Sequence, residues 1–452
     1  MTDVSIPAAK RKTRSRTLGR IALALLLLLS LAASVYPSEH PVALPGSLNT
    51  GDVGWMLTAT ALVLLMTPGL SFFYGGMVSR KNMLSTMLQS FIALGVVSLI
   101  WYAVGFSLVF GDSLGGVIGN PLTFAFFDGV GTAAHPRIAT GIPLLLFAAF
   151  QLKFAIITPA LITGSFAERI RFWSYLIFMV FFTLFVYCPV AHWVWHPDGF
   201  LFKMGVLDFA GGAVIHLSAG VAALTGALVL GRRHSHREGT VHQPSNIPYI
   251  LLGTGLLWFG WFGFNAGSSL GANEMAINAM VNTSLASASA MMAWMLLDVI
   301  NHKKPSTVGV CIGAVVGLAT ITPAAGYIVS GHSFLIGALA SLASYTVVHW
   351  KNRSEIDDTL DVFPCHGVGG ILGMLFTGIF ATEGGALYGS FALLGAQTLA
   401  VVVIGLYSLG LTWVLLKWTD RITPLRVSAE HELLGLDLSQ HDETAEPVVE
   451  YA

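Results

Sequence analysis

Long apolar segments recur at short intervals along the chain after residue 51. As α-helices, runs of about 20 apolar residues cross the ~30 Å hydrocarbon layer of a membrane, whereas barrel strands alternate polar and apolar residues. Asp, Glu, Lys and Arg make up only 10% of the 452 residues, far below the roughly 25% of a soluble domain. This composition excludes a soluble enzyme and predicts an all-α, multi-pass membrane protein. We place its eleven spans near residues 55–76, 83–110, 142–163, 173–190, 211–230, 249–267, 277–299, 308–321, 333–348, 367–380 and 391–416.

Basic residues separate the junctions between these spans into two sets. One set, together with the tail after the last span, holds 14 of them: Arg80, Lys81, Arg169, Arg171, Arg232, Arg233, Arg237, Lys303, Lys304, Lys351, Arg353, Lys417, Arg421 and Arg426. The opposite set holds only Arg137 and Lys203. Because basic residues concentrate on the cytoplasmic side of a membrane, the first set is predicted to be cytoplasmic. The mature N-terminus then lies outside and the C-terminus inside, which requires an odd number of spans.

The first 34 residues have the pattern of a secretory signal peptide. Six basic residues between positions 10 and 20 precede an 11-residue apolar run at 21–31, which is followed by Ala32-Ala33-Ser34. We expect this run to be too short for a membrane span, and the order of the three parts is typical of a cleavable signal. An uncleaved anchor helix is the alternative. We therefore divide the chain into a signal peptide at 1–34, a membrane domain at 51–418 and a cytoplasmic tail at 419–452.

Two histidines stand among apolar and small residues inside the predicted spans. His216 lies near the start of the fifth span and His366 at the start of the tenth; each has a glycine four residues on and an acidic residue before it, Asp208 and Asp361 respectively. Five spans followed by five that start from the opposite side predict an inverted repeat, with the eleventh span left over. Neutral imidazole has one donor and one acceptor, so two facing rings could share a proton and form a polar rail. The alternative is that each ring packs between helices and bonds a backbone carbonyl.

Further polar and aromatic residues lie near the outer ends of the spans. Trp195 lies in an outside loop before Asp208, where an aromatic face could attract a small cation. Asp208 stands just before the fifth span, where its carboxylate can accept hydrogen bonds from backbone N–H groups of the helix N-terminus. We favour that capping role over direct contact with a substrate. The three cysteines form no CxxC pair, so neither a metal site nor a disulfide framework is expected, and the sequence points to no cofactor.

Five groups of short, glycine-rich motifs lie between residues 68 and 370. They are PGLSFFYGG at 68–76, FQLKFAIIT at 150–158 leading to ERIRF at 168–172, DFAGGAVIH at 208–216, GWFGFNAGS at 260–268 and HGVGG at 366–370. In this order the motifs resemble those of the ammonium transporter (Amt/Mep/Rh) family, on the bacterial Amt side. The tail, from LRVS at 425–428 to GLD at 435–437, resembles the cytoplasmic tail of the same proteins.

The resemblance implies a homotrimer of eleven-helix protomers, each with its own pore through an inverted five-helix repeat. It also implies an outer site that recruits the ammonium ion, a gate of stacked rings, a twin-histidine pair and an acidic residue near the entrance. The residues that match these positions are Trp195, Phe154 and Ser268 for recruitment, Phe154 and Phe264 for the gate, His216 and His366 for the pair, and Asp208 for the acid.

We therefore expect a transporter of the bacterial cytoplasmic membrane that takes up ammonium or methylammonium and is not an enzyme. It would recruit the ion, deprotonate it and conduct ammonia past the two histidines. An ammonium sensor, an Rh-like neutral gas channel and a sodium-coupled solute carrier are the alternatives. A PII-type signal protein, which often blocks members of this family from the cytoplasm, is the protein partner that the resemblance suggests.

Overall fold

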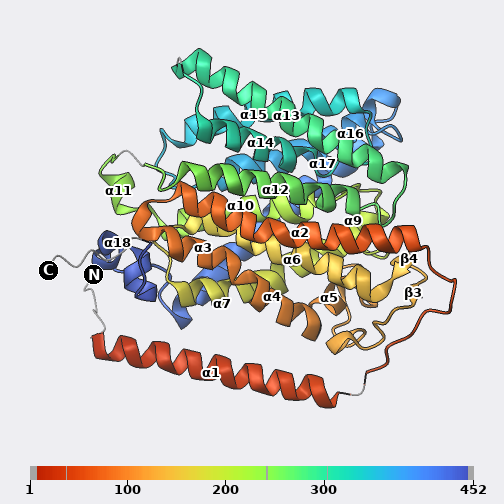
Figure 1. Cartoon of the computed structure of the whole chain (residues 1–452), viewed down its shortest axis with the longest axis horizontal. Coiled ribbons are helices and arrows are strands. Elements are labelled where there is room, and N and C mark those ends of the chain that lie inside the picture. Colours follow the sequence, from red (N-terminus) through yellow and green to blue (C-terminus); the bar gives the residue numbers. More distant parts are fainter. Residues whose placement is uncertain (1–7, 37, 241–242, 303, 446–452) are drawn as a thin grey trace.

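Helices form nearly all of the regular structure in the computed structural model, which describes residues 8–36, 38–240, 243–302 and 304–445. Figure 1 shows the long helices lying side by side along one direction of the molecule. Those of the bundle are α2 (Thr50–Met77), α3 (Met83–Phe91), α4 (Ala93–Ile100), α5 (Phe106–Phe110), α6 (Leu144–Phe166), α7 (Phe172–Phe182), α8 (Cys188–Trp195), α10 (Ser218–Leu230), α12 (Ile247–Gly267), α13 (Glu274–His302), α14 (Thr307–Ile321), α15 (Ser330–Lys351), α16 (Val368–Phe380) and α17 (Ala392–Ile422).

Short elements lie at the two ends of this bundle. Figure 1 shows α11 and α18 at one end, near the C-terminus, and α9, β3 and β4 at the other. Their bounds, with those of the remaining strands, are α9 (Phe200–Lys203), α11 (His234–Arg237), α18 (Ala429–Leu434), β1 (Ser113–Leu114), β2 (Ile118–Gly119), β3 (Ala134–His135) and β4 (Ala139–Pro143). The end with α11 and α18 is the one that the basic residues predict to be cytoplasmic.

Every predicted span coincides with a helix or with consecutive helical segments. Among the described residues, eleven helical segments are long and apolar enough to cross a membrane. Ten of them are the predicted spans other than the eighth, and one is Thr17–Val35 near the N-terminus. The eighth span is α14, which has only 15 residues but is buried along most of its length. The bundle of eleven spans therefore consists of α14 and those ten segments.

The N-terminal helix α1 (Ala8–Val35) is longer than we expected from the sequence. Its apolar stretch extends over 19 residues, Thr17–Val35, which is enough to cross a membrane. The expectation that this run is too short was therefore wrong, because Thr17–Arg20 and Ala32–Val35 continue the helix on both sides. Figure 1 shows α1 beside the bundle, with its first residues at the end where the C-terminus lies. Whether α1 is removed as a signal peptide stays a prediction.

The segment that follows α1 is bonded to a loop just before β3. The Glu39 carbonyl accepts a hydrogen bond from Gly129 N at 2.8 Å, and the Pro41 carbonyl accepts one from Ala133 N at 3.0 Å. Glu39 N donates to Asp128 Oδ1 at 2.8 Å. Residues 39–41 therefore belong to the folded membrane domain, whatever happens to α1.

The two helices that carry the predicted histidines approach each other at glycines. Wide, π-helical turns η5 (Gly212–Leu217) and η6 (Phe363–Gly367) precede α10 and α16. A Cβ atom on Gly220 would lie 2.1 Å from Gly367 N, and one on Gly370 would lie 2.6 Å from Leu217 N. Only glycine allows backbones this close. The glycine four residues after each histidine thus packs against the segment that carries the other histidine.

Candidate functional site

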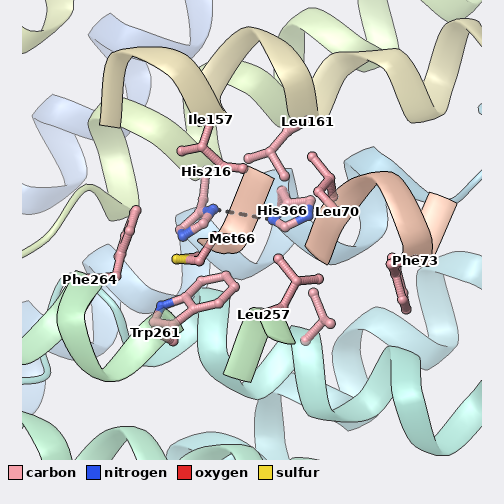
Figure 2. Close-up of a pocket in the computed structure, with 11 residues that line it drawn as sticks. Met66, Leu70, Phe73, Ile157, Leu161, His216, Leu257, Trp261, Phe264 and His366 are labelled. Atoms are coloured by element: carbon pink, nitrogen blue, oxygen red, sulfur yellow. Dashed lines mark hydrogen bonds between the residues drawn. The ribbon is translucent and has the colours of Figure 1, made fainter. Parts of the chain in front are cut away.

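His216 and His366 face each other in the middle of the bundle. Their Nδ1 atoms are 3.2 Å apart, and their rings stack with centroids 5.1 Å apart and planes 18° apart. Both side chains are buried. Figure 2 shows the two rings pointing toward one another from different elements, η5 and η6. The structure therefore brings together the two histidines that the repeat pattern singled out.

A narrow cavity surrounds this pair. Apart from the two imidazoles and Trp261, it is lined by apolar side chains: Met66, Leu70, Phe73, Ile157, Leu161, Leu257, Phe264 and Val315. The volume open to the centre of a water molecule is about 10 Å³. This is close to the smallest volume that can hold one water molecule. An ion with a hydration shell does not fit this space, whereas a single small neutral molecule does.

Stacked aromatic rings close one side of the cavity. Phe154 on α6 and Phe264 on α12 lie with ring centroids 4.3 Å apart and planes 22° apart. Both rings are buried. Phe264 also lies 6.2 Å from the ring of His216, so the stacked pair stands directly beside the histidines.

Trp195 and Ser268 lie beyond these rings. The Trp195 ring meets Phe154 edge-on, with centroids 5.9 Å apart, and its Nε1 donates to the Asp208 carbonyl at 3.0 Å. Ser268 follows α12 directly, and its hydroxyl donates to the Phe264 carbonyl at 2.9 Å. Both side chains are partly exposed. The order Trp195, Phe154, Phe264 and His216 thus runs from a partly exposed site to the buried cavity.

Asp208 caps the turn that carries His216. Its Oδ1 accepts hydrogen bonds from Gly211 N and Gly212 N at 2.9 and 2.6 Å. Its Oδ2 accepts from Ala213 N and Val214 N at 2.9 and 3.1 Å. Four N–H groups at a helix start are otherwise without partners, so this carboxylate holds η5 in place. These contacts match the capping role that we favoured from the sequence.

The corresponding acid in the second half is Asp358 and not Asp361. Asp358 lies eight residues before His366, as Asp208 lies eight before His216, and its Oδ2 accepts from Phe363 N at 2.8 Å. Asp361 instead pairs with Lys351, whose Nζ lies 2.6 Å from Asp361 Oδ1. From the sequence we matched Asp208 with Asp361, which is the acidic residue closest to His366 along the chain.

Trp261 is a cavity residue that the sequence reasoning missed. Its ring stacks on His216 with centroids 5.4 Å apart and planes 21° apart, and Figure 2 shows it beneath the histidine pair. It stands within the motif at 260–268, three residues before Phe264. That spacing places both rings on one helix face, which is the signal that could have identified it.

An ionic cluster lies at the end of the bundle with α11. Arg233 Nη1 is 2.6 Å from Glu168 Oε2, and Arg233 Nη2 is 2.9 Å from Asp357 Oδ1, with all three side chains buried. Burial by itself raises the pKa of Asp357, but the charges of Arg169 and Arg233 hold that pKa well below its usual range. The cluster therefore stays ionised and joins three separate connecting segments.

The tail docks on the same end of the bundle. Asp437 accepts hydrogen bonds from Leu84 N and Ser85 N at the start of α3, at 3.0 and 2.8 Å. Lys81 Nζ donates to the Leu433 carbonyl at 2.6 Å. Burial raises the pKa of Asp437, although backbone donors oppose this. The described part of the tail is therefore fixed to the first connecting loop.

Comparison with known proteins agrees with this arrangement. The model of the Ammonium Transporter Family matches residues 54–446. An ammonium transporter of Aquifex aeolicus is 46% identical over 437 residues, which cover 95% of this chain and 99% of the relative. Saccharomyces cerevisiae Mep2 has a crystal structure that matches with a TM-score of 0.83 and 34% identity, covering 90% of this chain and 94% of that one.

A further solved structure, described as a sensor Amt protein, matches with a TM-score of 0.79 and 29% identity, covering 86% of this chain and 98% of that one. The solved structures thus share the fold over most of the chain. On this evidence the chain belongs to the ammonium transporter family.

Proposed function

We propose that this protein takes up ammonium by recruiting the ion at the outer aromatic site, removing one proton and conducting ammonia past His216 and His366. Its membership of a transporter family and its multi-pass bundle support the general role. The order of the aromatic and polar side chains supports the specific steps.

Recruitment would use Trp195, Phe154 and Ser268. Aromatic faces attract cations, Trp most strongly. The Ser268 hydroxyl gives its hydrogen to the Phe264 carbonyl, so its oxygen is left to accept a hydrogen bond. An ammonium ion can donate one, whereas a potassium ion of similar size cannot. The site would therefore select for a cation that carries N–H groups.

Deprotonation would follow from the narrowness and the apolar lining of the cavity. Moving a full charge out of water into an apolar space costs many kcal/mol unless the charge is paired. The stacked rings of Phe154 and Phe264 close the way to hydrated ions, and the cavity beyond them is only about 10 Å³. Ammonia keeps its small size but loses the charge, so releasing one proton lowers the barrier to entry.

The histidine pair would supply hydrogen bonds along this apolar path. With one proton between the two Nδ1 atoms, one ring is the donor and the other the acceptor. His216 Nε2 is buried and has no hydrogen-bond partner among the described residues. It would be free to accept from, or donate to, a passing ammonia molecule. The same pair would offer the released proton a route that is separate from the ammonia.

The observation that carries this proposal is the close Nδ1 contact of His216 and His366 in a narrow, mostly apolar cavity beside the stacked Phe154 and Phe264 rings. Uptake of radiolabelled methylammonium would test it, in cells that produce this protein and lack ammonium carriers of their own. We expect saturable uptake that ammonium inhibits and that continues without sodium. A strict requirement for sodium would instead indicate a sodium-coupled carrier.

An ammonium sensor is the second candidate, because one of the matching solved structures is described as a sensor Amt protein. A sensor would bind ammonium at the outer site but carry little methylammonium. An Rh-like gas channel would not need a cation site. If Trp195→Ala leaves the half-saturating substrate concentration for uptake unchanged, the Rh-like gas channel is favoured.

We further propose that the protein forms a homotrimer in the bacterial cytoplasmic membrane and that a PII-type protein binds the end formed by α11 and α18. The exposed apolar side chains of α12 and α13, such as Phe259 and Ile277, support contact with lipid or with other copies of the chain. Native mass spectrometry of the detergent-solubilised protein would give the number of copies, and the addition of a purified PII-type protein would test the second point.

A further inference from the structure

The orientation of the Trp261 ring is determined by a residue outside the cavity. Trp261 Nε1 donates a hydrogen bond to Thr322 Oγ1 at 2.9 Å. The Thr322 hydroxyl in turn donates to the Leu318 carbonyl at 2.8 Å. An indole N–H can only donate and a hydroxyl has one hydrogen, so the direction of both bonds is fixed. Thr322 is fully buried and is not among the residues that line the cavity.

The segment that contains Thr322 also touches the turn that carries His216. Thr322 and Pro323 follow the end of α14. The Pro323 carbonyl accepts from Phe209 N at 3.1 Å, and a Cβ atom on Gly212 would lie 2.4 Å from the Pro323 ring. Residues 322 and 323 therefore contact two neighbours of His216: the indole that stacks on it and the turn that carries it.

The Thr322 bond has a chemical consequence for the cavity. The N–H is the one polar group of the Trp261 ring, and it is bonded to Thr322. The cavity is therefore lined by the apolar part of the indole. His216 Nε2, by contrast, is buried without a partner among the described residues. An indole N–H without an acceptor would be a buried unsatisfied donor, which is unfavourable. When the proton of the pair lies on His216 Nδ1, His216 Nε2, on the ring against which the indole stacks, is an acceptor that the indole could then engage.

We infer that Thr322 is a positioning residue that keeps the Trp261 N–H away from His216 Nε2, so that this nitrogen remains available to the transported molecule. The inference rests on the proposed transport past the histidines. Thr322 contacts no substrate in this account; it acts only through the indole.

The variant Thr322→Val removes the acceptor and nearly preserves the shape of the side chain. We expect a maximal rate of ammonium-induced current about tenfold lower, which corresponds to about 1.4 kcal/mol. The half-saturating concentration should stay the same, because the outer site is unchanged. Thr322→Ser, which keeps the hydroxyl, should restore most of the rate.

Thr320→Val is the matched control. Thr320 is also fully buried on α14, but its hydroxyl has no hydrogen-bond partner among the described residues. This control should keep the wild-type rate. Equal loss in Thr320→Val and Thr322→Val would show that any buried Thr→Val change there disturbs packing, and it would overturn the inference.

A double-mutant cycle separates positioning from general damage. Trp261→Phe keeps an aromatic ring but has no N–H, so adding Thr322→Val to it should have no further effect on the rate. If the loss of rate in the double variant equals the sum of the losses in the two single variants, in free-energy terms, the inference is overturned. Substitutions that break one and the same hydrogen bond should not add up in this way.

A structure of Thr322→Val gives a readout that does not depend on transport. We expect the indole Nε1 within hydrogen-bond distance of His216 Nε2. If the wild type carries no ammonium current, the proposed function fails, yet this structure still tests the positioning role. An indole in its wild-type orientation, with its N–H bonded elsewhere than to His216, would overturn the inference.

Discussion

His216 and His366 meet through the same ring atom, with their Nδ1 nitrogens 3.2 Å apart. A hydrogen bond between two Nδ1 atoms needs the proton on one of them, so the two neutral rings must be different tautomers. One ring then has a free acceptor at Nε2 and the other a donor. The pair is therefore asymmetric, although the two histidines occupy matching places in the two halves of the chain. To reverse that asymmetry, the Nδ1 proton must pass to the other ring, that ring must lose its Nε2 proton, and the first ring must gain a proton at Nε2.

Phe264→Ala should let potassium ions leak. Removing one of the two stacked rings opens the closed side of the cavity to water, and hydrated ions can then enter. Potassium flux into proteoliposomes would measure this. Phe178→Ala is a control, because Phe178 is equally buried but packs on Phe166 and Phe182 instead of lining the cavity. If Phe264→Ala leaves both ammonium transport and potassium exclusion unchanged, Phe264 serves only packing.

Arg233→Met should destabilise the protein by about 3–5 kcal/mol, because it removes the guanidinium group that pairs with the buried carboxylates of Glu168 and Asp357. Thermal unfolding in detergent would measure the loss. Arg232→Met is the matched control: its partner Glu355 is exposed, so little change is expected. A similar Tm for both variants would contradict this account of the cluster.

The contribution of Asp357 to the stability of the folded protein should not change between about pH 5 and pH 8. Its pKa in the folded state lies below the usual value, so its stabilising effect is complete above the unfolded pKa of about 3.9 and is lost as the pH falls through the lower folded pKa. The Tm difference between wild type and Asp357→Asn should therefore be constant over that range. A difference that shrinks already at pH 6 would indicate that Asp357 is protonated far more easily.

The N-terminal segment and the tail should lie on opposite sides of the membrane. His40 and Glu430 are exposed. The native cysteines Cys188, Cys311 and Cys365 are all buried. A membrane-impermeant thiol reagent should label His40→Cys from outside in intact cells, and Glu430→Cys only after the cells are opened. Labelling of both from the same side would contradict the eleven-span topology.

The sequence predicted the bundle well, because apolar runs and basic junctions follow directly from the energetics of the membrane. It predicted the histidine pair because each histidine needs a glycine one helical turn later, where the two halves touch. It matched Asp361 with Asp208, although the equal spacing of eight residues to each histidine points to Asp358, and the hydrogen bond of Asp358 to Phe363 N settles the choice. Thr322 could not be found at all: its bond to Trp261 joins residues 61 positions apart and depends on how α12 packs against α14.

An acidic residue in place of one histidine should admit cations. His216→Glu or His366→Asp puts a carboxylate into the apolar cavity, where it accepts hydrogen bonds and attracts positive charge. We expect potassium-induced current, which the wild type lacks. His332→Asp is the control, because His332 stacks on Phe380 and does not line the cavity. Potassium exclusion in both acidic variants would show that the cavity is not the conducting path.

Replacement of both histidines by leucine tests the central claim most directly. The measurement is substrate-induced current in proteoliposomes, with ammonium and with potassium as the test ions. The variant keeps apolar walls, so the pore need not collapse, but it lacks the hydrogen-bonded pair and the proton route. We predict that the ammonium current is strongly depressed and that potassium remains excluded. A variant that carries the wild-type ammonium current and still excludes potassium would contradict the account and would make His216 and His366 structural residues.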